Sequence, residues 1–193
     1  MGRLIIRSSL QSHFYSPFNG FVQNVDGLHQ RSGLSRNKLA VLHGCAFTEK
    51  CENCETEHFR DTDVGGMSFQ TTGRKCDICS GDLRDTLLDW DDPLPEADLA
   101  RSEDECERAD LVICLGTSLR ISPANQLPLN AKKFAVVNLQ QTLMDDEASI
   151  VIREKVDTVL IDVMSKLGYE HDESQTPQIV RLWKLQPEKE QGK

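Results

Sequence analysis

Four of the seven cysteines stand in two matched pairs, and their spacing is the strongest chemical signal in the sequence. Each pair has the form C-x-x-C, Cys51 with Cys54 and Cys76 with Cys79, and 21 residues (55–75) separate the pairs. Two such turns let four thiolates converge tetrahedrally on Zn²⁺ at ~2.3 Å. Four protein ligands leave no position open for water, so the pattern predicts a structural zinc site rather than a catalytic one.

A second group of polar residues follows the apolar pair Phe21-Val22. Gln23, Asn24 and Asp26 come directly after this predicted short strand, and His43 follows further along, just before Gly44. A histidine with a pKa near neutrality can accept a proton from a hydroxyl. Each residue also has a plainer explanation, since Asn and Asp often cap turns and a single histidine is more often a structural hydrogen-bonding residue.

Two more apolar runs end in small or polar residues. "DLVICLGTS" delivers Gly116, Thr117 and Ser118, and "VVNLQ" delivers Asn138. A glycine lets a ligand approach the backbone, and hydroxyls can bind phosphate or ribose. Three strands that end in this way predict a nucleotide cleft at the carboxyl edge of an α/β sheet. The dinucleotide fingerprint G-x-G-x-x-G does not occur in the sequence.

These residues need a scaffold, and the order of the segments predicts one. The runs at 111–116 and 133–137 are typical of buried parallel strands, whereas 95–109 has helical composition. Residues 156–167 carry apolar side chains at helical spacing before Gly168. Apolar density falls between Cys45 and Gly81, which indicates an inserted module. We therefore predict a parallel α/β sheet with an inserted zinc-binding subdomain at about 45–81.

The composition narrows the class of protein. The 193 residues are 38% hydrophobic and 27% charged, which is typical of a soluble globular protein, and cysteine usage favours metal binding inside the cell over disulfides. The net charge of −9 argues against a general nucleic-acid-binding surface. Residues 89–107 hold nine acids and one base. They are most simply a solvated surface; the alternative is an acidic rim that attracts lysine-rich tails.

Several long motifs in one order carry a family resemblance. "QNVDGLHQRSG", "GDLRDTLLDWDDPLPEADL", "GTSLRISP" and "VNLQ" resemble the sirtuins, which are NAD-dependent protein deacylases. "LDWDD" resembles the chromatin-associated subgroup, since many other sirtuins have a Phe-Gly-Glu type of sequence there. The resemblance covers about Phe21 to Gly168. It implies a Rossmann-type domain with a zinc ribbon, and a cleft between them in which NAD and acyl-lysine meet.

The resemblance also implies roles for individual residues. His43 would be the general base, which activates a ribose hydroxyl after the acyl-lysine oxygen has displaced nicotinamide, and Asn24 would orient water and ribose. Asp89 and Trp90 would clamp the substrate strand, and the four paired cysteines would hold Zn²⁺. The NAD-binding set would be Gln23, Asn24, Asp26, Gly116, Thr117, Ser118, Asn138, Leu139 and Val156. Histone tails, chromatin and a nuclear location are further expectations from the resemblance.

The amino end departs from the family pattern. Sirtuins begin their catalytic domain with a strand and a Gly-Ala-Gly-hydrophobic-Ser phosphate turn, and residues 1–20 contain neither motif. A partial Rossmann-type sheet without its first strand unit is therefore expected over 21–168, followed by a polar tail at 169–193. Three alternatives stay open: a truncated gene model or splice form, a short chain in which "RLIIRSS" partly fills the gap, and a non-catalytic, zinc-stabilised interaction module.

Overall fold

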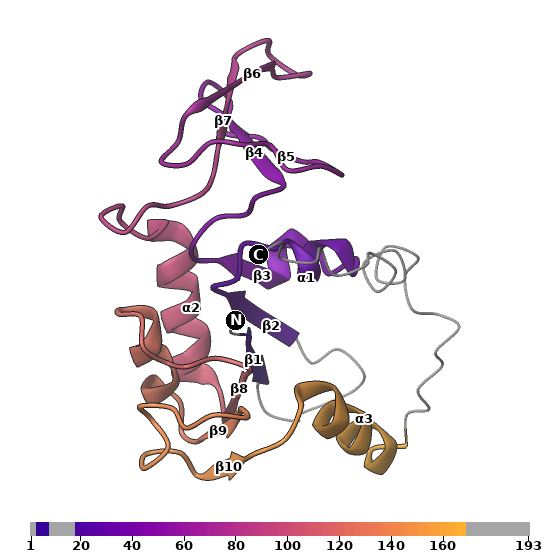
Figure 1. The fold of residues 1–193 in the computed structure, drawn as a ribbon, viewed down its shortest axis with the longest axis vertical. Helices are drawn as coiled ribbons and strands as arrows, with labels where there is room; N and C mark the ends of the chain where they lie inside the picture. The colour runs from indigo at the N-terminus through magenta and orange to yellow at the C-terminus, as the bar shows by residue number, and fades with distance from the viewer. Residues whose placement is uncertain (1–2, 8–17, 169–193) are drawn as a thin grey trace, which may run out of the picture.

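The chain folds into a six-stranded sheet with a smaller, four-stranded sheet at one end (Figure 1). The computed structural model describes residues 3–7 and 18–168. In the large sheet, the strand order is β10-β9-β8-β1-β2-β3. The bounds are β1 Arg3–Arg7, β2 Phe18–Val22, β3 Leu39–Val41, β8 Leu111–Leu115, β9 Phe134–Val137 and β10 Ile150–Ile152. The strands predicted at 111–116 and 133–137 are confirmed as β8 and β9.

Strand β1 lies between β8 and β2, at the central position of the sheet where the family resemblance implied a missing strand. It is antiparallel to both neighbours, whereas the pairs β2–β3, β8–β9 and β9–β10 are parallel. A gap there would leave unpaired N–H and C=O groups on both neighbours, and β1 supplies partners for them. Residues Arg3–Arg7, the part of "RLIIRSS" that the structure describes, therefore fill the gap, and the sheet is parallel apart from this one reversed strand.

The smaller sheet forms the zinc-binding module. Its strand order is β5-β4-β7-β6, and every pairing is antiparallel. The bounds are β4 Thr48–Cys51, β5 Glu57–Phe59, β6 Thr71–Lys75 and β7 Asp82–Asp85. Its apolar core is very small, since the buried cluster holds only Cys51, Cys76 and Leu83. The fully buried Glu49 forms ion pairs with Arg60 and Arg74.

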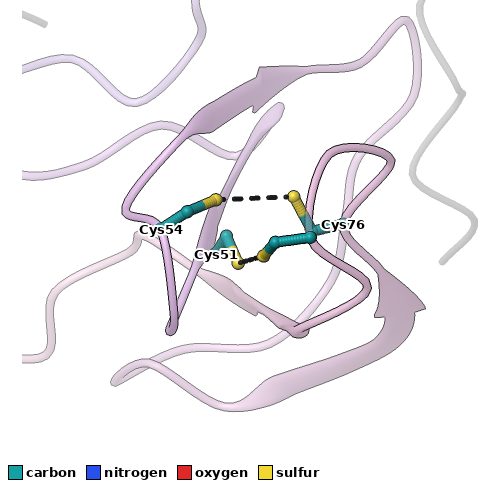
Figure 2. Close-up of side chains that lie close together, drawn as sticks. Cys51, Cys54 and Cys76 are labelled. Atoms are coloured by element: carbon teal, nitrogen blue, oxygen red, sulfur yellow. Dashed lines mark hydrogen bonds between the residues drawn. The ribbon is translucent and has the colours of Figure 1, made fainter.

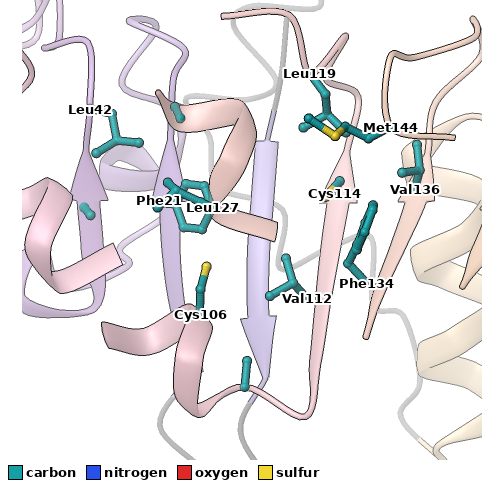
Figure 3. Close-up of a cluster of buried hydrophobic side chains, with 13 residues drawn as sticks. Phe21, Leu42, Cys106, Val112, Cys114, Leu119, Leu127, Phe134, Val136 and Met144 are labelled. Carbon is teal, nitrogen blue, oxygen red and sulfur yellow. The ribbon is translucent and has the colours of Figure 1, made fainter. Parts of the chain in front are cut away.

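One face of the large sheet forms the main core with helix α2 (Glu96–Arg108) and the 3₁₀ segment η2 (Ala124–Asn130). Figure 3 shows how the side chains from neighbouring strands meet there. The labelled residues are Phe21, Leu42, Cys106, Val112, Cys114, Leu119, Leu127, Phe134, Val136 and Met144. Burial raises the pKa of the Cys114 thiol, so this residue is an inert part of the core.

The other face of the sheet is covered near β2 and β3. A cluster of Val22, Leu39, Val41 and Cys45 packs there beneath Leu34 and Phe47. Helix α1 (Leu28–Arg31) and the 3₁₀ turn η1 (Arg36–Lys38) connect β2 to β3. Both connections contact the zinc module, since Arg31 of α1 donates to the Asp61 carbonyl at 3.2 Å and Arg36 of η1 forms an ion pair with Glu57 at 2.7 Å.

The carboxyl part of the described chain contains the predicted helix and one strand that was not predicted. Helix α3 (Val156–Lys166) stops just before Gly168, whose φ of 82° is left-handed, as expected for a helix end. No side chain of α3 is buried among the described residues. Strand β10 is only three residues long, too short for a clear pattern. The predicted tail at 169–193 lies outside the described residues. None of the described helices has the length and apolar content needed to cross a membrane.

Candidate active site and zinc centre

Five strands of the large sheet point their carboxyl ends to one edge. Arg3 of β1 pairs with both Val22 and Leu115, Leu115 pairs with Val137, and Val41 pairs with Val22. These residues therefore form a level row. Adjacent strands lie ~4.8 Å apart, so the row spans on the order of 20 Å from β3 to β9. The residues that follow the row gather along one edge, where α/β proteins bind ligands.

The three polar groups identified in the sequence lie along this edge. Gln23, Asn24 and Asp26 follow β2; Gly116, Thr117 and Ser118 follow β8; Asn138 and Leu139 follow β9. The structure thus places the three groups along one edge of the sheet. The reversed β1 brings its amino end to this edge, so the central position contributes no turn of the kind that follows a parallel strand.

Hydrogen bonds hold the backbone of each turn in place. Asp26 Oδ1 accepts a hydrogen bond of 3.1 Å from the backbone N–H of Leu28 and so caps the start of α1. Thr117 Oγ1 accepts from the backbone N–H two residues later, at 3.2 Å, and Thr117 is buried. Asn138 Nδ2 donates to the Gln140 carbonyl at 2.8 Å. The plain turn-capping explanation is therefore correct for Asp26, and it does not exclude ligand contacts by other atoms.

The remaining predicted NAD contacts differ in exposure. Gln23 and Asn24 are half-buried, whereas Ser118 and Leu139 are exposed. Val156 is the first residue of α3 and is half-buried. Asn24 and Asp26 line a hollow of only about 10 Å³, which is separate from the cleft that contains His43. The structure thus does not bring Asn24 and His43 into one cavity.

His43 lies two residues beyond β3 in a cleft of about 650 Å³. The predicted substrate residues Asp89 and Trp90 line the same cleft, and Trp90 is 87% exposed. The apolar wall consists of Val25, Met67, Leu88, Pro93, Leu94, Leu99, Ile121 and Pro123. The acidic lining consists of Asp89, Asp92 and Glu96. The segment that returns from the zinc module and the loop after β8 therefore form a pocket around His43.

The electrostatics of His43 suit a general base. Burial lowers the pKa of His43 below its ordinary 6.5, and a hydrogen bond to the Gln23 backbone opposes this only in part. The imidazole is therefore mainly neutral at pH 7 and able to accept a proton. Together, the cleft and the neutral imidazole allow proton abstraction from a hydroxyl bound beside His43.

Most of the cleft wall was not predicted from the sequence. Met67 lies in a polar stretch of the zinc module, where nothing in the pattern points to a site. Ile121 follows the Gly-Thr-Ser turn in "GTSLRISP", and its place next to that motif was the available signal. Apolar wall residues look like core residues in a sequence, because both are recognised by the same hydrophobic character.

The four paired cysteines come together as predicted, and their geometry fits Zn²⁺. All four Sγ atoms lie within 4.8 Å of one another. Cys54 Sγ lies 3.7 Å from Cys76 Sγ, and Cys51 Sγ lies 3.4 Å from Cys79 Sγ (Figure 2). A tetrahedral site with Zn–S bonds of ~2.3 Å has S–S edges of about 3.8 Å. These ligands would complete a structural site, which lies in the module and does not line the His43 cleft.

The surroundings of the sulfurs also suit a metal. Hydrogen bonds with the side chain and backbone of Thr56 lower the pKa of Cys54 to about 6, which favours the thiolate. The backbone hydrogen bond at Gly81 lowers the pKa of Cys79, but its sulfur neighbours outweigh this and raise it to about 12. A metal must therefore displace a proton from Cys79 when it binds. His58 Nε2 lies 3.3 Å from Cys76 Sγ and can donate to a bound thiolate.

Comparison with known proteins identifies the family. The model of the Sir2 family matches residues 7–123, which is more than half of the chain. The chain belongs to the Sir2 family. The sirtuin resemblance seen in the motifs is thereby confirmed, and with it the expected combination of a Rossmann-type sheet and a Cys₄ module.

Relatives with curated names are called NAD-dependent protein deacetylases. SRT1 of Arabidopsis thaliana is 48% identical over 152 residues, a match that covers 76% of this chain and 32% of that protein. Sirt6 of Drosophila melanogaster is 42% identical over 163 residues, covering 77% and 51%. Human sirtuin-7 is 34% identical over 166 residues, covering 77% and 41%. The sirtuin chain thus spans about a third to a half of the length of these relatives.

Solved Sir2 structures share the fold. A Sir2 homolog in complex with NAD superposes with a TM-score of 0.61 at 29% identity, covering 77% of this chain and 57% of that one. Sir2 bound to an acetylated peptide gives a TM-score of 0.60 at 29% identity, covering 78% and 63%. The sirtuin chain therefore shares the fold of about 60% of each of these two structures, of which one contains NAD and the other an acetylated peptide.

Proposed function

We propose that this sirtuin chain is an NAD-dependent protein-lysine deacylase that moves the acyl group from lysine to ADP-ribose and releases nicotinamide. The observation that carries the proposal is the half-buried, neutral His43 in a cleft of about 650 Å³ beside the carboxyl edge of a Rossmann-type sheet. A base placed at such an edge, between the sheet and a zinc module, is in a position to act on a ribose hydroxyl.

Each part of the proposed reaction has residues that would serve it. His43 would take the proton from the ribose hydroxyl, and its hydrogen bond to the Gln23 backbone would fix the orientation of the ring. Asn24 would orient ribose and water from the neighbouring hollow. Gly116, with a left-handed φ of 59°, would let phosphate approach the backbone after β8. The apolar wall would exclude water around the acyl chain.

The lining of the cleft supports a basic protein segment as the substrate. Asp89, Asp92 and Glu96 line it, and none of the described residues that line it is Lys or Arg. The exposed Trp90 offers a flat apolar surface to an extended peptide. Acyl-lysine segments rich in Lys and Arg, such as histone tails, match this charge. We extend the proposal to chromatin as the site of action and to a nuclear location, on the same charge argument and the family resemblance.

A second candidate function is a non-catalytic, zinc-stabilised interaction module. The reversed β1 favours it, because the central strand brings no carboxyl-end turn to the edge where phosphate would lie. Such a module would keep the acidic cleft and bind acyl-lysine peptides without turning over NAD.

Steady-state nicotinamide release over many turnovers by zinc-loaded protein, with NAD and an acetylated histone-tail peptide, tests the proposal, because each new turnover requires the preceding His43 step to be complete. Loss of the general base should lower the rate in His43→Ala by at least about 100-fold. Arg108→Ala, an exposed change on α2, is the control and should match the parent. Peptide binding without any nicotinamide release by the folded parent would overturn the enzyme proposal in favour of the interaction module.

The charge of the substrate is tested with a second peptide. A peptide of equal length with acidic residues flanking the acetyl-lysine should react more slowly, and equal rates would contradict the basic-substrate proposal.

A further inference from the structure

The strand that leads to His43 is an edge strand, and side chains cover its outer side. Strand β3 pairs with β2 and lies at the end of the sheet. On its other side, the Val41 N–H donates to Asp98 Oδ2 at 3.1 Å. The Leu39 carbonyl accepts hydrogen bonds from Arg36 and from Arg101, the latter at 2.7 Å. The side chains of Asp98, Arg36 and Arg101 thus satisfy the backbone hydrogen-bonding groups on this edge, as a neighbouring strand would.

Asp98 is the centre of this arrangement. It lies on α2, is only 7% exposed, and accepts from both arginines. Its carboxylate oxygens lie 2.7 Å from Arg36 Nη2 and 2.7 Å from Arg101 Nη2, in addition to the Val41 contact. A carboxylate that accepts from two guanidinium groups and a backbone N–H is fixed in one orientation. Asp98 therefore ties α2 to the outer edge of β3.

Arg36 extends the arrangement into the zinc module. Its Nε and Nη2 donate to the two carboxylate oxygens of Glu57 on β5, at 2.7 and 3.0 Å. The same guanidinium donates to Asp98 and to the Leu39 carbonyl. One side chain thus joins the zinc module, helix α2 and strand β3. Figure 1 shows where these three parts lie in the fold.

His43 follows Val41 by two residues, and the intervening Leu42 is fully buried in the main core. A shift of β3 therefore moves the imidazole. We propose that Asp98, with Arg36 and Arg101, is a positioning residue that fixes His43 in the cleft through the outer edge of β3, and that Arg36 and Glu57 make the zinc module part of the same constraint. The inference rests on the proposed role of His43. The role that we assign to these ion pairs is to hold His43 in position and not to stabilise the fold, because buried ion pairs often add little net stability compared with apolar residues of the same volume.

The variants separate the contacts of the network. Asp98→Ala removes the acceptor and the charge, whereas Asp98→Asn keeps an oxygen for the Val41 N–H and loses the charge. Glu57→Gln weakens only the link to the zinc module. Asp104→Ala is the matched control: it removes an Asp–Arg ion pair on the same helix, with Arg108, at an exposed site away from β3.

Amide hydrogen exchange and kinetics are measured on full-length, zinc-loaded protein. In Asp98→Ala, we expect the Val41 amide to exchange at least about tenfold faster, with Val136 on β9, between β10 and β8, unchanged. Asp98→Asn should lie closer to the parent, because it keeps an acceptor. We expect kcat to fall by about 10- to 100-fold in Asp98→Ala, with KM for NAD changed by less than about threefold. Glu57→Gln should lower kcat less than Asp98→Ala does, with its zinc content unchanged.

Two results would overturn the inference. One is Val41 exchange in Asp98→Ala equal to that in Asp104→Ala. The other is faster exchange throughout the sheet, Val136 included, which would mean that Asp98 only stabilises the fold. If Asp98→Ala does not fold, Asp98→Asn and Glu57→Gln carry the test, with the same exchange and kcat readouts. A parent without turnover would sink the proposed function, whereas the exchange pattern would still decide whether Asp98 holds β3.

Discussion

Gly44, next to His43, offers a sharp test of how the cleft is built. Its φ is 78°, which is left-handed, and an added Cβ would lie 1.8 Å from the carbonyl oxygen of Thr86. It would also lie 2.9 Å from Leu87 Cα. The atoms that the Cβ would meet belong to the backbone, so no side-chain rotation can relieve the clash. In Gly44→Ala, the segment that returns from the zinc module must therefore move away from His43.

Two contributions set the loss of unfolding free energy that we expect in Gly44→Ala. A left-handed alanine costs about 1 kcal/mol relative to glycine. Ordinary contact begins at 3.4 Å, so the Thr86 carbonyl must retreat by 3.4 − 1.8 = 1.6 Å. Overpacking of this kind costs about 1–3 kcal/mol. We expect Gly44→Ala to lower the free energy of unfolding by about 2–4 kcal/mol, and the displacement beside His43 to lower kcat by about 100-fold.

Gly33 provides a matched control for the conformational contribution. Its φ is 84°, close to that of Gly44, but a Cβ there would meet nothing within 4 Å. Gly33→Ala should therefore cost only about 1 kcal/mol and leave kcat unchanged. Urea unfolding followed by circular dichroism gives both free energies. If Gly44→Ala were no more destabilising than Gly33→Ala, the tight contact with Thr86 would be wrong, and with it the placement of the returning segment.

Two further predictions concern the metal and the proton. Removal of zinc by a chelator should unfold the small module, because its buried cluster is only two cysteines and one leucine. Trypsin should then cleave after the exposed Arg74 and Lys75. Continued resistance to trypsin in protein shown to be free of zinc would contradict this prediction. The pH profile of kcat/KM should fall on the acid side with a midpoint below 6.5, because the neutral form of His43 is the base and burial lowers its pKa. Half of the base form is therefore lost only at a pH below 6.5 as pH falls, and a midpoint above 6.5 would refute the assignment.

The sequence by itself determined the local chemistry. The two C-x-x-C pairs fixed the four zinc ligands, because tight turns of this form place two sulfurs together whatever the rest of the chain does. Apolar runs fixed β8 and β9, since a strand buried on both faces must be apolar throughout. The small and polar residues after these strands indicated a ligand-binding edge, and the order of the motifs indicated the family.

Tertiary structure alone decided the rest. The direction of β1 could not be predicted, because "RLIIR" has the same pattern whether it runs parallel or antiparallel to its neighbours. The same holds for the cleft wall, which brings Met67 and Ile121 together from distant segments. The ion pair of Asp98 with Arg36, 62 residues away in the chain, likewise had no signal, since charged residues on a helix usually face solvent. Strand pairing and side-chain contacts across 60 residues depend on the packed fold, and local sequence patterns carry no information about either.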